Sequence, residues 1–163
     1  MKVDLLLCLA LAGGLAAGCS RSEPVAAAKQ APPHHEHKPP HRGTPVELGE
    51  EENHVEFVLD APQGKLQAFV MDGELENFVR IPAEALEITA QVAGHPETLI
   101  MRAVANNATG EKVGDTSLFE AQADWLKSTP NFEGVLKEIT VRGKTYTNIA
   151  FRFPKGNDEG AKK

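Results

Sequence analysis

Short segments in which apolar and polar residues alternate constrain this chain more than any other feature. In the clearest of them, Leu86, Ile88, Ala90 and Val92 alternate with polar residues. An alternation with a period of two is typical of a β-strand that buries one face. Similar segments recur between residues 45 and 154, separated by Gly, Asn and Pro, and we expect further strands at 55–60, 65–72, 77–82, 98–105, 135–142 and 145–153.

The segment from Ser117 to Pro130 is ambiguous. Ser117 and Glu120 have the spacing of a helical capping box, whereas Phe119 and Ala121 alternate as in a strand. We favour a strand over residues 117–122, followed by a helical turn that ends before Pro130, because the surrounding segments are β.

These segments together predict an all-β domain over residues 45–154. Seven or eight short strands with frequent turns favour an antiparallel, immunoglobulin-like β-sandwich with one short helical turn. We expect Trp125 and Tyr146 to be core or corner residues rather than a ligand platform. Residues 155–163 are predicted to be a disordered polar tail.

The first 18 residues are predicted to be a secretory signal peptide. Lys2 provides a positive start, Leu5 to Leu15 form an uncharged apolar run, and small residues follow at 16–18. The run is shorter than the roughly 20 apolar residues that a membrane-spanning helix needs.

The sequence Leu15-Ala-Ala-Gly-Cys19 closes this segment and resembles the lipobox of bacterial lipoproteins. The resemblance implies a diacylglycerol thioether on Cys19, cleavage before it, and acylation of the new N-terminus with a fatty acid such as palmitate. Ser20 stands where an Asp would resemble the inner-membrane retention signal, so the resemblance favours an anchor in the outer membrane, facing the periplasm. The alternative is an ordinary signal peptide with an accidental cysteine.

Residues 19–44 are predicted to form a disordered tether. They are rich in Ala, Pro, His and Lys and contain few large apolar residues, so they bury too little surface to order. Because imidazole is a good ligand for copper, zinc and nickel, the tether histidines are candidate metal ligands: His34, His35, His37 and His41. The alternative is a solvated linker in which these histidines are inert.

Three motifs extend from the tether to the end of the domain: His41-Arg-Gly-Thr-Pro-Val-Glu-Leu-Gly49, Phe132-Glu-Gly134 and Gly143-Lys-Thr-Tyr146. They resemble a group of small uncharacterised bacterial envelope lipoproteins with a His- and Pro-rich tether and a C-terminal β domain. The resemblance implies a companion of heavy-metal efflux systems, with an envelope protein as partner.

Catalytic and nucleotide-binding motifs are absent from the sequence, which has no nucleophile elbow, P-loop, Rossmann glycine pattern or HExxH. From residue 45 onward it carries 12 Lys and Arg against 20 Asp and Glu. Such an acidic domain is a poor nucleic-acid binder, because phosphate contacts need cations. Glu50, Glu51 and Glu52 with His54 form the densest acidic group, which we interpret as a solvated segment rather than a cation site. His95 stands alone in a turn.

We therefore expect a lipid-anchored, non-catalytic binding or interaction lipoprotein. It needs no cofactor, and its tether would capture copper, zinc or nickel for a metal-handling or efflux system. Two alternatives stay open: a structural envelope lipoprotein with an inert tether, and a hydrolase whose site assembles from distant loops.

Overall fold

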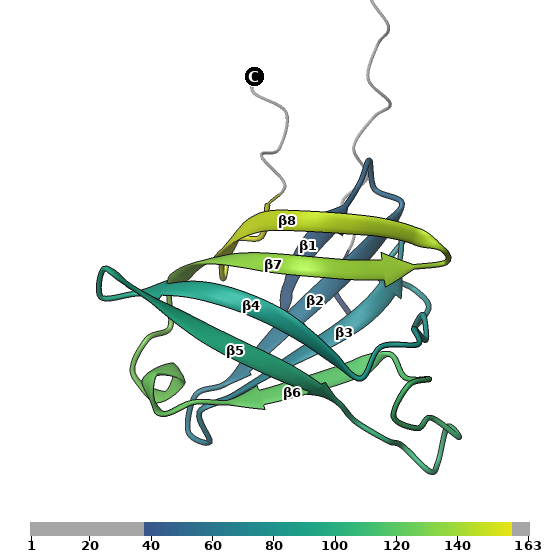
Figure 1. Ribbon diagram of the computed structural model, residues 1–163, viewed down its shortest axis with the longest axis horizontal. Helices are drawn as coiled ribbons and strands as arrows, with labels where there is room; N and C mark the ends of the chain where they lie inside the picture. The colour runs from purple at the N-terminus through teal and green to yellow at the C-terminus, as the bar shows by residue number, and fades with distance from the viewer. Residues whose placement is uncertain (1–37, 158–163) are drawn as a thin grey trace, which may run out of the picture. The chain divides into compact units, whose positions relative to one another are not determined.

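The fold is taken from a computed structural model, which describes residues 38–157. Eight strands and one 3-10 turn make up this part of the chain (Figure 1). Their bounds are β1 Thr44–Leu48, β2 Asn53–Asp60, β3 Lys65–Asp72, β4 Ala85–Val92, β5 His95–Ala103, β6 Leu118–Gln122, η1 Asp124–Lys127, β7 Phe132–Val141 and β8 Lys144–Phe153. The predicted all-β class, the strand number and the short helical turn after residue 122 are confirmed.

The eight strands belong to one sheet with the order β1-β2-β3-β6-β5-β4-β7-β8, and every ladder is antiparallel. An immunoglobulin-like sandwich has two separate sheets, but here β6 pairs with both β3 and β5 and so joins the two halves. The sheet curls until its two edge strands, β1 and β8, come into contact (Figure 1). The inner face of a single nearly closed barrel therefore encloses the core.

The seam between the edge strands is closed by a side chain. The amide of Asn157 accepts a hydrogen bond from the backbone N–H of Glu47 at 2.7 Å and donates one to the Glu47 carbonyl at 3.1 Å. The Asn157 amide thus makes the two hydrogen bonds that the backbone of a neighbouring strand would otherwise make with Glu47. Pro45, on the same edge, has no N–H to satisfy. The exposed edge that makes a sheet prone to aggregation is in this way largely removed.

The core consists of the inward residues of the alternating segments, as predicted. Phe57 of β2 stacks on Phe151 of β8, with ring centroids 4.8 Å apart. Trp125 packs edge-on against Phe132 at 5.3 Å, and Tyr146 is buried. The expectation that Trp125 and Tyr146 are core or corner residues is therefore confirmed.

Two local features differ from the sequence-based expectation. Residues 77–82 form no strand, because their hydrogen bonds are divided between β3 and the segment before β6: Val79 bonds to Val70, and Ile81 to Thr116. Strand β1 was not predicted. It begins inside the stretch assigned to the tether, and the ordered contacts reach residue 157, beyond the predicted end of the domain at 154.

Several predictions concern parts of the chain outside the described residues. They are the signal peptide, Cys19, most of the tether with His34, His35 and His37, and the last six residues. Within residues 38–157, no helix has the length and apolar character required to cross a membrane.

Candidate functional site

His41 is the one tether histidine in the described part of the chain, and it is packed against the domain. A turn closed by a hydrogen bond from Arg42 N–H to the Pro39 carbonyl, 3.0 Å long, brings the chain back over β2 just before β1 begins. The imidazole stacks on Phe69 of β3, with centroids 3.9 Å apart and planes 15° from parallel. The end of the predicted tether is therefore part of the folded structure.

Beneath His41 lies the carboxylate of Glu56, whose side chain is 0% exposed. Its Oε2 atom is 2.8 Å from Nδ1 of His41. Its Oε1 atom accepts hydrogen bonds from the backbone N–H groups of His41, at 3.0 Å, and Gly43, at 2.8 Å. Three donors thus satisfy a group that would be costly to bury alone.

The strand alternation explains why a carboxylate lies here. Val55 and Phe57 point into the barrel, so Glu56 points outward, between Pro45 of β1 and Phe69 of β3. The chain crosses above it at Gly43. A Cβ atom at this position would lie 2.5 Å from the Phe57 carbonyl oxygen, so only glycine permits the approach.

The tautomer of His41 follows from these contacts. A carboxylate only accepts hydrogen bonds, so in the neutral ring Nδ1 carries the proton and Nε2 keeps its lone pair. The side chain is 35% exposed. Beside it, Phe78 is 51% exposed and its ring centroid is 5.7 Å from that of His41. Nε2 therefore keeps its lone pair on a partly exposed ring that lies beside the aromatic side chain of Phe78.

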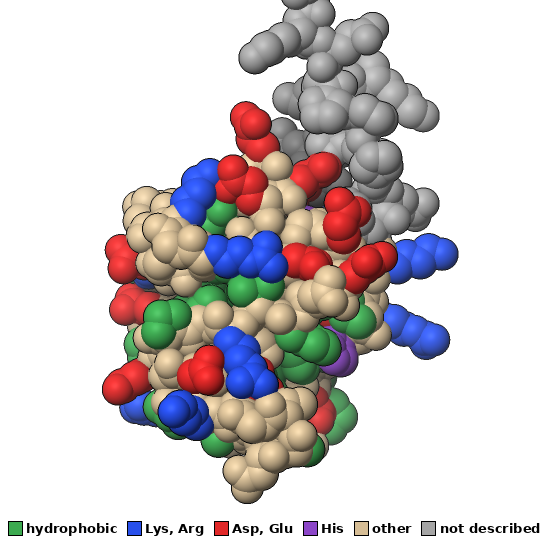
Figure 2. Space-filling view, turned by 90° about the vertical axis from the view of Figure 1, so that its right-hand side faces the viewer, with side chains coloured by type: hydrophobic (Ala, Val, Ile, Leu, Met, Phe, Trp, Pro, Cys, Tyr) green, Lys and Arg blue, Asp and Glu red, His purple; other side chains and the backbone are tan. Residues whose placement is uncertain are grey.

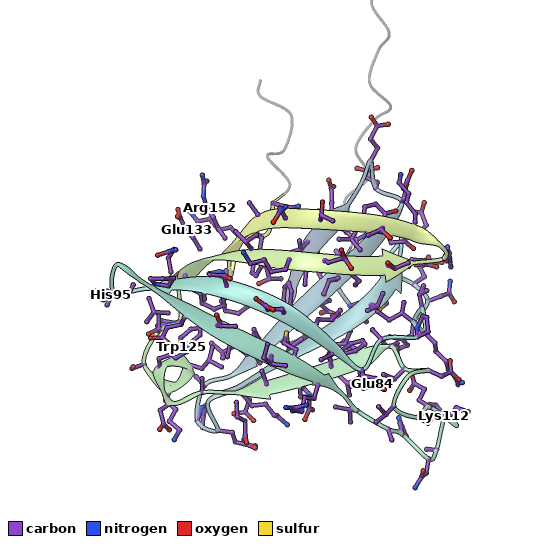
Figure 3. All side chains as sticks on the ribbon, in the orientation of Figure 1. Glu84, His95, Lys112, Trp125, Glu133 and Arg152 are labelled. Atoms are coloured by element: carbon purple, nitrogen blue, oxygen red, sulfur yellow. The ribbon has the colours of Figure 1, made fainter. Side chains whose placement is uncertain are left out.

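His41 has no companion ligands among the described residues. Within residues 38–157, no group of three or more His, Cys, Asp or Glu side chains is arranged to hold a metal ion. His54 is buried on β2, with Nδ1 3.3 Å from the Asp72 carbonyl oxygen. His95 lies at the tip of the β4–β5 hairpin (Figure 3). A metal bound through His41 would need further ligands from outside this set.

In the acidic group at residues 50–52, Glu52 is engaged by side chains of the β7–β8 hairpin. Glu52 accepts hydrogen bonds from Lys144 and from the Tyr146 hydroxyl, which together lower its pKa. Burial and the bond to Glu52 raise the pKa of Tyr146. These contacts join the β1–β2 turn to the β7–β8 hairpin, which is a structural role. Asn53, next to them, leaves its buried Oδ1 without a hydrogen-bond partner in the described structure.

A second buried carboxylate, Glu111, organises the loop before β6. Its oxygens accept hydrogen bonds from the N–H and hydroxyl of Ser117, at 2.9 and 2.6 Å, and from the Thr109 hydroxyl at 2.7 Å. Burial raises the pKa of Glu111, but these hydrogen bonds and the Arg80 guanidinium outweigh it and leave the pKa below its usual value. All of its hydrogen-bond donors lie within six positions of it, so these bonds fix a loop, and Arg80 adds an ion pair from outside the loop.

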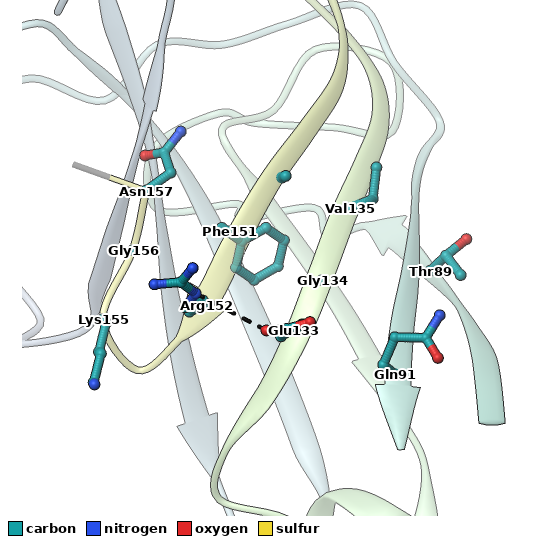
Figure 4. A pocket seen from close by; sticks show the side chains of 11 residues that line it. Thr89, Gln91, Glu133, Gly134, Val135, Phe151, Arg152, Lys155, Gly156 and Asn157 are labelled. Atoms are coloured by element: carbon teal, nitrogen blue, oxygen red, sulfur yellow. Dashed lines mark ion pairs between the residues drawn. The ribbon is translucent and has the colours of Figure 1, made fainter. Parts of the chain in front are cut away.

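An open groove of about 440 Å³ lies on the outer face of β4, β7 and β8 (Figure 4). Small side chains line it, among them Thr89, Val135 and Ala150. Glu133 and Arg152 form an ion pair there, with Oε1 of Glu133 3.9 Å from Nε of Arg152. We did not predict this groove. The sequence shows the small outward residues, but it does not show that β4 lies beside β7.

On the face shown in Figure 2, acidic side chains gather in the upper part with a few basic ones among them, and acidic, basic and apolar side chains are mixed below.

No protein-family model, curated protein or solved structure that we compared with the chain matches it.

Proposed function

We propose that the protein is a lipid-anchored, non-catalytic lipoprotein of the bacterial envelope that captures transition metal ions through its histidine-rich tether. The ligands are His34, His35, His37 and His41, and the metal is copper, zinc or nickel. The anchor is acylated Cys19 in the outer membrane, with the domain facing the periplasm. A metal-handling or efflux system would be the partner.

The observation that carries this proposal is the state of His41. Its Nδ1 is engaged by a buried carboxylate, which leaves the lone pair of the neutral ring on Nε2, and the side chain is 35% exposed. Metal-binding histidines generally have such a partner on the second nitrogen, which fixes the tautomer and raises the basicity of the ligand atom. The other three histidines lie four to seven positions earlier in the chain.

The same geometry also supports a second candidate, a structural envelope lipoprotein in which His41 only fastens the chain to β2. In that case the stack on Phe69 and the bonds to Glu56 serve packing alone. The two candidates differ in whether Nε2 ever binds a metal.

Calorimetric titration of the full-length chain in detergent micelles with copper, zinc and nickel salts tests the proposal. We expect micromolar or tighter binding at neutral pH that weakens at mildly acidic pH, because protons compete for imidazole. Replacing all four tether histidines by Ala should abolish it, whereas His95→Ala should not. Equal heats for the wild type and the four-histidine variant would leave the structural role as the explanation.

The anchor makes a separate prediction. Cys19→Ala should abolish incorporation of radiolabelled palmitate in growing cells and release the protein from the membrane fraction, since one thioether lipid and one N-terminal acyl chain together give stable anchoring. Cys8→Ala is the matched control, because Cys8 lies before the expected cleavage point. Undiminished labelling of the Cys19→Ala variant would contradict the lipoprotein assignment.

A further inference from the structure

We infer that His41 binds metal through Nε2 and that Glu56 is its positioning residue, so that metal binding is coupled to the folded β domain. This inference rests on the proposed function and adds which atom binds and what holds it. In this inference the geometry of His41 is set by the domain before the metal arrives.

The first step concerns the choice of nitrogen. In a free neutral imidazole either nitrogen can carry the proton, and a metal must select the tautomer that presents a lone pair. For His41 the selection is made by the Glu56 carboxylate, 2.8 Å from Nδ1. Nε2 is consequently the ligand atom in the metal-free protein.

The second step concerns the orientation of the ring. Rotation of the imidazole is restricted by the contact of Nδ1 with Glu56 and by the stacked ring of Phe69, with the two ring centroids 3.9 Å apart. The backbone of His41 is held as well, through its N–H bond to Glu56. A ligand that is already ordered loses less conformational entropy on binding than a mobile one. His41 should therefore lose little conformational entropy when it binds a metal.

The third step concerns the remaining ligands and the type of metal. His37 precedes His41 by four positions, and a chain of that length spans at most about 14 Å even when extended. Its closeness in the sequence makes His37 the first candidate for a further ligand. Imidazole donors beside aromatic side chains favour copper, zinc or nickel over magnesium or calcium, which prefer oxygen ligands.

Glu56→Gln is the decisive substitution. Glutamine has the same shape, and its carbonyl oxygen can still accept the backbone bonds from His41 and Gly43. Its amide then faces Nδ1 as a donor, which moves the ring proton to Nε2 and blocks the ligand atom. We expect zinc affinity to fall about 10- to 100-fold, as when other second-shell partners of metal-binding histidines are removed.

The experiment uses nitrogen NMR of the histidine rings in the full-length chain, with zinc chloride as the probe. Without zinc, the His41 signals should report the Nδ1–H tautomer in the wild type and the Nε2–H tautomer in Glu56→Gln. With zinc, the Nε2 signal of wild-type His41 should shift as the ion binds. Glu97→Gln, an exposed glutamate of β5, is the matched control and should bind zinc as the wild type does.

The outcomes separate the two proposals. Zinc binding with unmoved His41 signals, or with equal affinity in Glu56→Gln and the wild type, would overturn the inference and leave metal capture by the tether standing. An Nε2–H tautomer in the metal-free wild type would also overturn it. The absence of zinc, copper and nickel binding by the wild type would instead overturn the proposed function, and the inference with it.

Discussion

At the scale of single residues, the domain satisfies its buried carboxylates by different routes. Glu56 bonds to an imidazole and two backbone N–H groups of the segment that crosses above it. Glu111 takes its bonds from Ser117 and Thr109, within six residues along the chain. Glu56 therefore joins the segment before β1 to strand β2, whereas the hydrogen bonds of Glu111 stabilise a loop.

Glu111 gives a prediction for acid stability. Its pKa is lower in the folded protein than the usual 4.5, so the folded state binds fewer protons than the unfolded state. The resulting stability is present above the unfolded pKa and is lost as the pH falls through the folded value. Urea unfolding from neutral to acidic pH should show that Glu111→Gln costs about 1–3 kcal/mol at neutral pH.

The pH dependence distinguishes this effect from simple loss of packing. The difference between Glu111→Gln and the wild type should shrink as the pH falls below 4.5. Glu97→Gln, on the exposed face of β5, is the control and should follow the wild type throughout. A difference that stays constant with pH would show that the charge of Glu111 contributes nothing.

At the scale of elements, the crossing of residues 41–43 over β2 depends on one glycine. At Gly43, a Cβ atom would lie 2.5 Å from the Phe57 carbonyl oxygen and 2.8 Å from the side chain of Glu56. The Phe57 oxygen belongs to the central backbone of β2 and cannot move freely. A side chain at position 43 would therefore lift this segment away from the sheet.

Gly43→Ala should detach His41 from Glu56. We expect hydrogen exchange at the His41 amide to accelerate, because its bond to Glu56 is lost, and zinc affinity to fall toward that of His41→Ala. Gly94→Ala controls for backbone strain away from the crossing, because Gly94 has a φ of +83° but no atom within 4 Å of its Cβ position, and it should leave the His41 amide protected. Unchanged protection of the His41 amide in Gly43→Ala would contradict the packing argument.

The elements also show what can be predicted from sequence and what cannot. Strand β4 was predicted because the alternation of Leu86, Ile88 and Ala90 is local. The site was only partly predicted: His41 was identified from composition, but Glu56 carried no signal beyond that of an outward polar residue. Their contact joins residues 15 apart, of which only His41 lies in the segment whose composition indicates a tether. Such non-local pairing leaves no trace in a local pattern.

At the scale of the whole molecule, the barrel is nearly closed because its two edge strands, β1 and β8, come into contact. The contact of Asn157 with Glu47 joins residues 110 positions apart. It holds the first strand, and with it the segment that carries His41, against the end of the last strand. We therefore expect the C-terminal end of the domain to influence the stability of β1.

Asn157→Ala should destabilise the domain by about 0.5–1.5 kcal/mol, because the part-buried backbone N–H and carbonyl of Glu47 lose their hydrogen bonds to the Asn157 side chain. Hydrogen exchange at the Glu47 amide should rise more than at the amides of β4. Lys155 is exposed on the same turn. Lys155→Ala should therefore leave the stability of the domain and the hydrogen exchange of the Glu47 amide unchanged. Full protection of the Glu47 amide in Asn157→Ala would show that backbone contacts close the seam without the side chain.

The most direct test of the central claim is the thermal unfolding of the domain with and without zinc, in the wild type and in His41→Ala. Zinc held only by His34, His35 and His37 would bind the folded and unfolded chain alike and leave the folding equilibrium unchanged. If Glu56 presents His41 to the metal, zinc should raise the Tm of the wild type, by about 4 °C for each 1 kcal/mol of coupling, and should leave that of His41→Ala unchanged. Equal responses of the two proteins to zinc would contradict the account.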